Sequence, residues 1–113
     1  LDLVGLRYAT RLNGFTEIAV TKLDTLDGLK TLKVCTGYKV NGQLIEGMPL
    51  TPDLYHVEPV YQELPGWDST AKARSWNELP KEAQDYIKLI EQVCKAPATL
   101  ISVGPERSAT FSR

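Results

Sequence analysis

The first twenty residues pass from a helical to an extended hydrophobic pattern. Apolar side chains recur at Val4, Tyr8 and Leu12, a spacing that predicts an amphipathic helix over residues 3–12, ended by the Asn-Gly pair that follows. The continuous apolar run after it predicts a short strand over residues 17–20 with both faces buried, as in a parallel sheet. The chain is therefore predicted to open with a helix and then a strand.

The middle of the chain carries strand patterns separated by turn residues. Residues 32–40 partly alternate apolar and polar side chains, which predicts a strand. Asn41-Gly42 predicts a tight hairpin, because both central positions of a type I′ turn need positive φ, and residues 43–46 then form the returning strand. Residues 55–63 also look extended, with Pro59 restricting them to an edge or irregular strand. This block is predicted to be an antiparallel appendage to the main sheet.

The remainder of the chain combines a long helix with a final strand. Pro80 suits the first turn of a helix that continues to about Lys95. Residues 98–101 are predicted to form a strand that leads into a loop at residues 102–105, and residues 106–113 to form a polar tail. The apolar face predicted for the helix consists of Ala83, Ile87, Ile90 and Cys94.

Composition narrows the class of protein. The 113 residues match one ordinary domain, residues 1–113 as a single unit. The 13 basic and 14 acidic side chains give a net charge of −1 without a block of either sign, which argues against a nucleic-acid partner.

No apolar run reaches the roughly 20 residues of a membrane span, so we expect a cytoplasmic protein with no membrane partner. Cys35 and Cys94 are predicted to be reduced, packed thiols, and His56 to be a surface residue.

Polar residues follow the first predicted strand at the point where it would leave the sheet. Thr21-Lys22-Leu23-Asp24 come directly after the apolar run. An ionised aspartate accepts two hydrogen bonds side by side, and guanine offers two adjacent donors, N1–H and the N2 amino group. Adenine presents a lone pair in place of N1–H, so Asp24 would discriminate between the two bases. The stem of Lys22 would lie along the purine face while its ammonium stays in water.

A second loop stands at the end of the last predicted strand. In open α/β sheets ligands bind at the carboxyl ends of the strands, so residues 102–105 are expected to close on the same base. Gly104 would let backbone approach the ligand, and Ser102 and nearby N–H groups would donate to a carbonyl such as guanine O6. The alternative is an ordinary Ser/Gly/Pro turn, which these residue types also favour.

Eight short pieces of the chain form a pattern whose order and spacing are specific. They are Leu-Arg-Tyr-Ala (6–9), Asn13-Gly14, Thr-Lys-Leu-Asp-Thr-Leu-Asp-Gly-Leu (21–29), Val-Glu-Pro-Val-Tyr (57–61), Leu-Pro-Gly-Trp (64–67), Tyr86-Ile87, Ile90-Glu91 and Ser-Val-Gly-Pro-Glu-Arg (102–107). Taken together, these motifs resemble the C-terminal part of the adenylosuccinate synthetase family over essentially the whole chain. The resemblance implies an α/β fold: part of a mostly parallel, P-loop-NTPase-like sheet with flanking helices and an antiparallel hairpin appendage. It also implies a guanine-base site for GTP made of Lys22, Leu23, Asp24, Ser102, Val103 and Gly104.

The family's activity defines the expected substrates and partners. By this resemblance the full-length protein is a ligase of purine biosynthesis that joins L-aspartate to inosine monophosphate (IMP) at the expense of GTP. It would use Mg²⁺ and act as a cytoplasmic homodimer. The chain has no glycine-rich phosphate loop, and the resemblance places the family's catalytic residues and Mg²⁺ ligands upstream of the matched part. We therefore expect no catalytic residue or metal ligand in this segment, and no activity from the segment alone.

Two interpretations of the chain remain open at this point. It begins at Leu1-Asp2 without an initiator methionine, which suggests a segment of a longer protein, either truncated or naturally split. The alternative function, from a different class, is a non-catalytic guanine-nucleotide-binding module or a structural companion chain that completes a separate N-terminal half.

Overall fold

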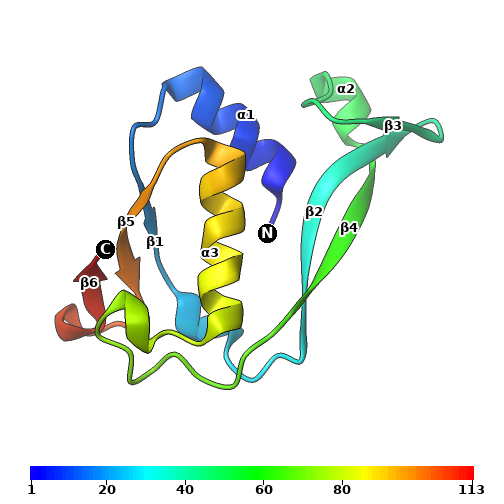
Figure 1. Ribbon diagram of the computed structural model, residues 1–113. Coiled ribbons are helices and arrows are strands. Elements are labelled where there is room, and N and C mark those ends of the chain that lie inside the picture. Colours follow the sequence, from blue (N-terminus) through cyan, green and yellow to red (C-terminus); the bar gives the residue numbers. More distant parts are fainter.

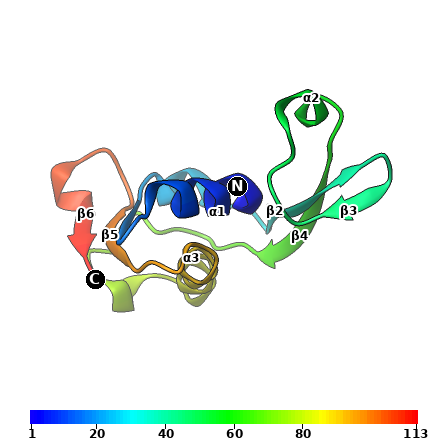
Figure 2. The same ribbon diagram turned by 90° about the horizontal axis from the view of Figure 1, so that it is seen from above.

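Two three-stranded sheets stand on either side of a pair of helices in the computed structural model, which describes residues 1–113 (Figure 1). Seen from above, the helices α1 and α3 again lie between the two sheets, and the long hairpin projects to one side (Figure 2). The helices are α1 (Leu3–Asn13), α2 (Thr51–Leu54) and α3 (Lys81–Cys94), with 3₁₀ turns η1 (Leu23–Leu26), η2 (Trp76–Glu78) and η3 (Arg107–Ala109). The strands are β1 (Ile18–Val20), β2 (Thr31–Val40), β3 (Gln43–Ile45), β4 (Glu58–Pro65), β5 (Ala98–Ser102) and β6 (Thr110–Ser112).

The smaller sheet has the order β1-β5-β6 and contains the one parallel pair. β1 and β5 run in the same direction, whereas β6 returns antiparallel to β5. The part of the predicted mostly parallel sheet that this chain forms is therefore mixed, because the short connection after β5 permits only an antiparallel neighbour. The polar tail predicted at residues 106–113 was also wrong in part, since it forms β6. The predicted burial of β1 on both faces is not met either, because β1 is an edge strand and Ala19 is exposed.

The larger sheet confirms the predicted antiparallel block. Its order is β3-β2-β4, and both pairings are antiparallel. Asn41 and Gly42 have φ values of 50° and 80°, as the type I′ hairpin requires. Pro59 lies on β4, opposite Tyr38 of β2. β4 is an edge strand, where proline is tolerated although it has no N–H to donate to a neighbouring strand. A short helix, α2, lies between β3 and β4 and was not predicted.

Helix α1 is confirmed, but its predicted apolar face is wrong. Asp2 caps its first turn, and Gly14 ends it with φ 62° in the left-handed region. Val4 is buried, whereas Tyr8 is 41% exposed and Leu12 is 70% exposed. α1 packs against α3 and β2, and those contacts bury the helix face that carries Leu3 and Val4 rather than the whole four-residue stripe.

Helix α3 is confirmed and supplies the largest share of the core. It begins one residue after Pro80 and ends at Cys94, with Lys95 in the left-handed region as its cap. The face predicted to be apolar is buried, and Tyr86 is buried beside it.

Cys35 and Cys94 are free and buried, and His56 is exposed, as predicted. No helix combines the length and apolar character that crossing a membrane requires. The main core cluster comprises Leu3, Leu23, Leu32, Val34, Trp67, Ala73, Leu79, Ala83, Tyr86, Ile87, Ile90, Cys94, Ala96, Ala98, Ile101, Val103 and Ala109.

Candidate functional site

The parallel pairing of β1 and β5 brings the two predicted loops to one edge of the sheet. Val20 and Ile101 are register partners, so Thr21, the residue after β1, and Ser102, the last residue of β5, lie at the same level on neighbouring strands. Neighbouring strands lie about 4.8 Å apart, and the carboxyl ends of both strands point the same way (Figure 1). η1 also packs against β5. The structure therefore places the residues 22–24 and 102–104 close to one another, as the sequence predicted.

The backbone of the first loop is held by local hydrogen bonds and one buried side chain. Leu23 is buried in the main core together with Ile101 and Val103. Lys22 is exposed and has φ 57°, a conformation that costs a non-glycine residue roughly 1–2 kcal/mol. The hydroxyl and the N–H of Thr25 both donate to the Lys22 carbonyl, at 2.7 and 3.1 Å. A strained residue held in this way is typical of a functional loop.

The two aspartates of this loop have opposite surroundings. Asp24 is half-buried, and its carboxylate has no hydrogen bond or ion pair within the protein. The carboxylate of Asp27 accepts from Trp67, Ser69 and Thr70 and is fully used inside the fold. Partly buried charges need partners, so Asp24 is the carboxylate of this loop that is open to a ligand.

The second loop has less free hydrogen-bonding capacity than the sequence suggested. The Ser102 hydroxyl donates to the Gly104 carbonyl at 3.0 Å, and the Val103 N–H donates to the Ala109 carbonyl at 3.0 Å. The Gly104 N–H has no acceptor in the protein, so it is the free donor of this loop. Gly104 is not in the left-handed region. Gly104 is therefore favoured by the limited space rather than by its φ angle, because an added Cβ would lie 3.3 Å from the Ala109 Cβ.

Glu91 of α3 holds the start of β5 and the C-terminal tail. Its carboxylate accepts from the Ala98 N–H at 2.8 Å and from the Arg113 guanidinium. Burial raises the pKa of Glu91, but these two donors outweigh burial and hold the pKa below its ordinary value. The guanidinium of Arg113 also lies 3.6 Å from the centre of the Trp76 ring. The sequence showed no signal for this cluster, which joins residues distant along the chain.

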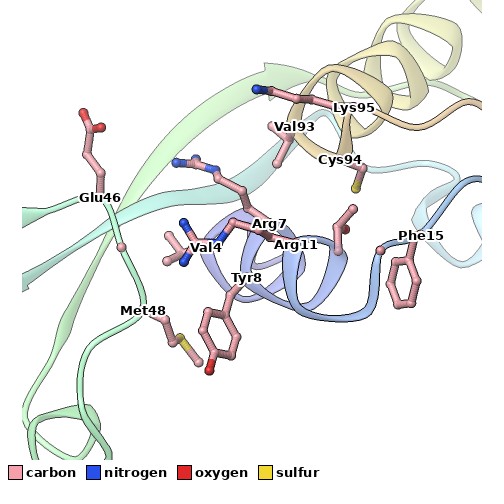
Figure 3. Close-up of a pocket in the computed structure, with 13 residues that line it drawn as sticks. Val4, Arg7, Tyr8, Arg11, Phe15, Glu46, Met48, Val93, Cys94 and Lys95 are labelled. Carbon is pink, nitrogen blue, oxygen red and sulfur yellow. The ribbon is translucent and has the colours of Figure 1, made fainter.

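A sizeable cavity lies away from the predicted residues. It has a volume of about 590 Å³ and is enclosed by α1, the segment after β3 and the end of α3 (Figure 3). Arg7 and Arg11 extend from α1 toward the side on which Glu46 lies, and Lys95 stands above them. None of the residues 22–24 or 102–104 lines it. These two loops lie at an open edge of the smaller sheet. The candidate site is therefore defined by the loops and their free hydrogen-bonding groups, and not by the cavity.

A second cavity, of about 510 Å³, is mostly apolar and runs along β1. Its lining includes the apolar side chains of Leu6, Val20 and Ile90 and two polar residues, Glu17 and Thr21. No group of three or more His, Cys, Asp or Glu side chains is arranged to hold a metal ion.

Comparison with known proteins gives one consistent result. Residues 1–111 match the family described as Adenylosuccinate synthetase. The chain is 47% identical to adenylosuccinate synthetase 2 of Methanosarcina acetivorans over 114 aligned positions and 49% identical to the adenylosuccinate synthetase of Thermoanaerobacter sp. over 113. These alignments cover 99% and 98% of this chain, but only 27% and 26% of those proteins.

A solved structure, described as fully ligated adenylosuccinate synthetase from Plasmodium falciparum, has the same fold over the whole chain. The TM-score is 0.92 at 33% sequence identity, and the match covers 100% of this chain and 28% of that one. The chain thus spans about a quarter of the length of the proteins it matches.

Proposed function

The chain belongs to the adenylosuccinate synthetase family, and on that premise we propose that it is the C-terminal portion of a GTP-dependent synthetase that binds the guanine base of GTP. The base-binding residues are Lys22, Leu23 and Asp24 of the first loop and Ser102, Val103 and Gly104 of the second. In this proposal the residues select and hold the nucleotide. The reacting groups belong to other parts of the enzyme.

The observation that carries the proposal is the free carboxylate of Asp24. It lies in η1, which packs against β5, and no donor of the protein reaches it. An aspartate accepts the two adjacent donors of guanine together, and a purine without that donor pair leaves the carboxylate unsatisfied. A buried unsatisfied polar group costs roughly 1–3 kcal/mol, and a charged one more. Asp24 therefore supplies the preference for guanine over adenine.

The other groups of the site complete the contact with the base. The Gly104 N–H has no protein acceptor and is the natural donor to guanine O6. The hydroxyl of Ser102 already donates to the Gly104 carbonyl, so Ser102 shapes the loop that presents that N–H. The aliphatic stem of the exposed Lys22 covers one face of the purine, as long charged side chains commonly do.

The activity proposed for the whole enzyme is ligation of L-aspartate to IMP with GTP as co-substrate. The γ-phosphoryl group of GTP is transferred to the 6-oxygen of IMP with release of GDP, and the aspartate amine then displaces that phosphate to give adenylosuccinate. Phosphoryl transfer depends on positioning and charge neutralisation. Mg²⁺ would neutralise the charge of the phosphate groups, and its ligands would lie outside these residues.

We further propose that the whole enzyme is a cytoplasmic homodimer and that β1 and β5 belong to a larger parallel sheet of P-loop-NTPase type. The unpaired edge of β1 supports the larger sheet, and the free thiols support the cytoplasmic location.

The test of base recognition is Asp24→Asn in the full-length protein. An amide offers one acceptor in place of two, so the ratio of kcat/KM for GTP to that for ATP is expected to fall at least tenfold. Asp53→Asn is the matched control, because Asp53 is exposed on α2 and its side chain has no partner. An unchanged ratio in Asp24→Asn would remove Asp24 from base recognition and with it the proposed function of this segment.

The companion-chain alternative differs in what precedes these residues. The reading frame that encodes the chain tests the C-terminal assignment directly. Synthetase sequence with a glycine-rich phosphate loop upstream of these residues would support the assignment, and such sequence only downstream would contradict it.

A mixing assay tests whether the enzyme is naturally split. The chain alone is expected to show no adenylosuccinate formation, because base contacts by themselves must offset an association cost of roughly 4–15 kcal/mol. Turnover that appears only with a separate N-terminal chain would favour the companion-chain function.

A further inference from the structure

Asp27 is the centre of a hydrogen-bond network between two segments that lie far apart in the sequence. Its carboxylate accepts from the Trp67 indole N–H at 2.7 Å, from the Thr70 N–H and hydroxyl at 2.8 and 3.0 Å, and from the Ser69 hydroxyl at 3.2 Å. Hydrogen bonds to a charged acceptor are the strong class.

Backbone hydrogen bonds join the same two segments. The Gly28 N–H donates to the Trp67 carbonyl at 2.9 Å, and the Gly66 N–H donates to the Lys30 carbonyl at 3.0 Å. These bonds flank the side-chain network of Asp27. Residues 27–30 are thereby tied to residues 66–70.

Two of the three residues that donate to Asp27 are buried. Trp67 is 4% exposed and Thr70 is 1% exposed. The Trp67 ring packs against Tyr86 of α3, with ring centres 5.7 Å apart and planes at 55°. Asp27 is therefore hydrogen-bonded to side chains that are packed in the core.

Asp27 in turn fixes the end of η1, the turn that carries Asp24. Asp27 is the residue that ends η1, and its N–H donates to the Asp24 carbonyl at 3.1 Å. At the other end of this turn, Leu23 is buried in the core. The backbone of Asp24 is thus held from both sides, while its carboxylate stays free.

We propose that Asp27 is a positioning residue for nucleotide selection: its network holds η1 in the one placement in which Asp24 meets the base. Asp27 does not touch the base, since four donors already use its oxygens. This inference rests on the proposed function of the Asp24 site and adds to it a residue that controls how sharply the site discriminates.

The test is Asp27→Asn in the full-length synthetase. The asparagine side chain carries an NH₂ group in place of one carboxylate oxygen, and this group would face at least one of the four donors. The network then loses hydrogen bonds, and η1 is held less firmly in place. The KM for GTP is expected to rise about tenfold and the GTP/ATP preference to fall by a similar factor. The kcat at saturating GTP and the KM values for IMP and aspartate are expected to stay close to wild type. The control is Asp68→Asn, the same chemical change at an exposed aspartate without a hydrogen bond in the adjoining loop.

The split between KM and kcat separates positioning from general stability. If Asp27 were important only for folding, Asp27→Asn would lower the active fraction, reduce kcat with all substrates and leave the GTP/ATP preference unchanged. That result would overturn the inference.

Thr70→Val keeps the test decisive if Asp27→Asn does not fold. Valine fills nearly the same volume as threonine but removes the hydroxyl that donates to Asp27. A smaller shift in the same direction, chiefly in KM for GTP, would support the inference, and an unchanged KM and preference would overturn it. Failure of the inference differs from failure of the proposed function: if Asp24→Asn removes the GTP preference and both network variants keep it, only the positioning role is lost.

Discussion

The hydroxyl of Tyr38 on β2 donates a hydrogen bond to the carboxylate of Asp2, the residue that caps helix α1. The other oxygen of that carboxylate accepts from the N–H groups of Val4 and Gly5, at 2.9 and 3.1 Å. The bond therefore couples the start of α1 to the antiparallel sheet. Burial of Tyr38, followed by this hydrogen bond, raises the pKa of the phenol above its ordinary value.

Tyr38→Phe is expected to lower the free energy of unfolding by about 1.5–3 kcal/mol, the usual worth of a hydrogen bond to a charged group. Because the pKa of Tyr38 is raised in the folded state, its contribution is complete below the unfolded pKa of about 10 and is lost as pH rises above that value. Urea unfolding between about pH 7 and about pH 11 measures both effects.

The wild-type protein is expected to lose more stability than Tyr38→Phe does over the alkaline part of that range. Tyr55→Phe is the control, because Tyr55 is 83% exposed and has no such partner. Equal alkaline slopes for wild type and Tyr38→Phe would contradict the assigned role of this pair.

Gly66 lies where the loop after β4 passes the chain at Leu29. A Cβ added at Gly66 would sit 1.7 Å from the Leu29 carbonyl oxygen, a contact that only a backbone shift can relieve. Gly66→Ala is expected to cost about 3 kcal/mol, at the upper end of overpacking effects. Gly47→Ala is the matched control, because nothing lies near the added Cβ and its φ is not left-handed. Thermal unfolding of both variants decides the point, and equal midpoints would disprove the predicted clash.

Gly104→Val is expected to weaken GTP binding at least tenfold, because a branched side chain would occupy the space through which the Gly104 N–H meets the base. The same change also crowds Ala109, whose Cβ would be 3.3 Å from the new Cβ. Adding Ala109→Gly removes that crowding and leaves the obstruction at the base. Titration calorimetry with GTP then separates the two causes: weak binding that persists in the double variant supports the site, and binding restored to wild type returns the loop to an ordinary turn.

Local interactions let the sequence alone determine several parts of this protein. The Asn41-Gly42 hairpin follows from the φ values that its turn demands, and α3 follows from a stripe whose period matches the helix. The chemistry of the candidate site is also local in origin, because a Lys-x-Asp motif directly after an apolar strand already points to a polar edge of a sheet. Each signal needs only a few neighbouring residues and the geometry of the backbone.

Contacts between distant residues were decided by the tertiary structure. Whether Tyr8 is buried depends on which face of α1 meets α3 and β2, and residues 110–112 form a strand only because β5 offers a free edge. Asp24 and Asp27 are chemically identical and three positions apart, so no local pattern separates a free carboxylate from a fully bonded one. The difference arises because Trp67 and Thr70, some forty positions along the chain, donate to one and not the other.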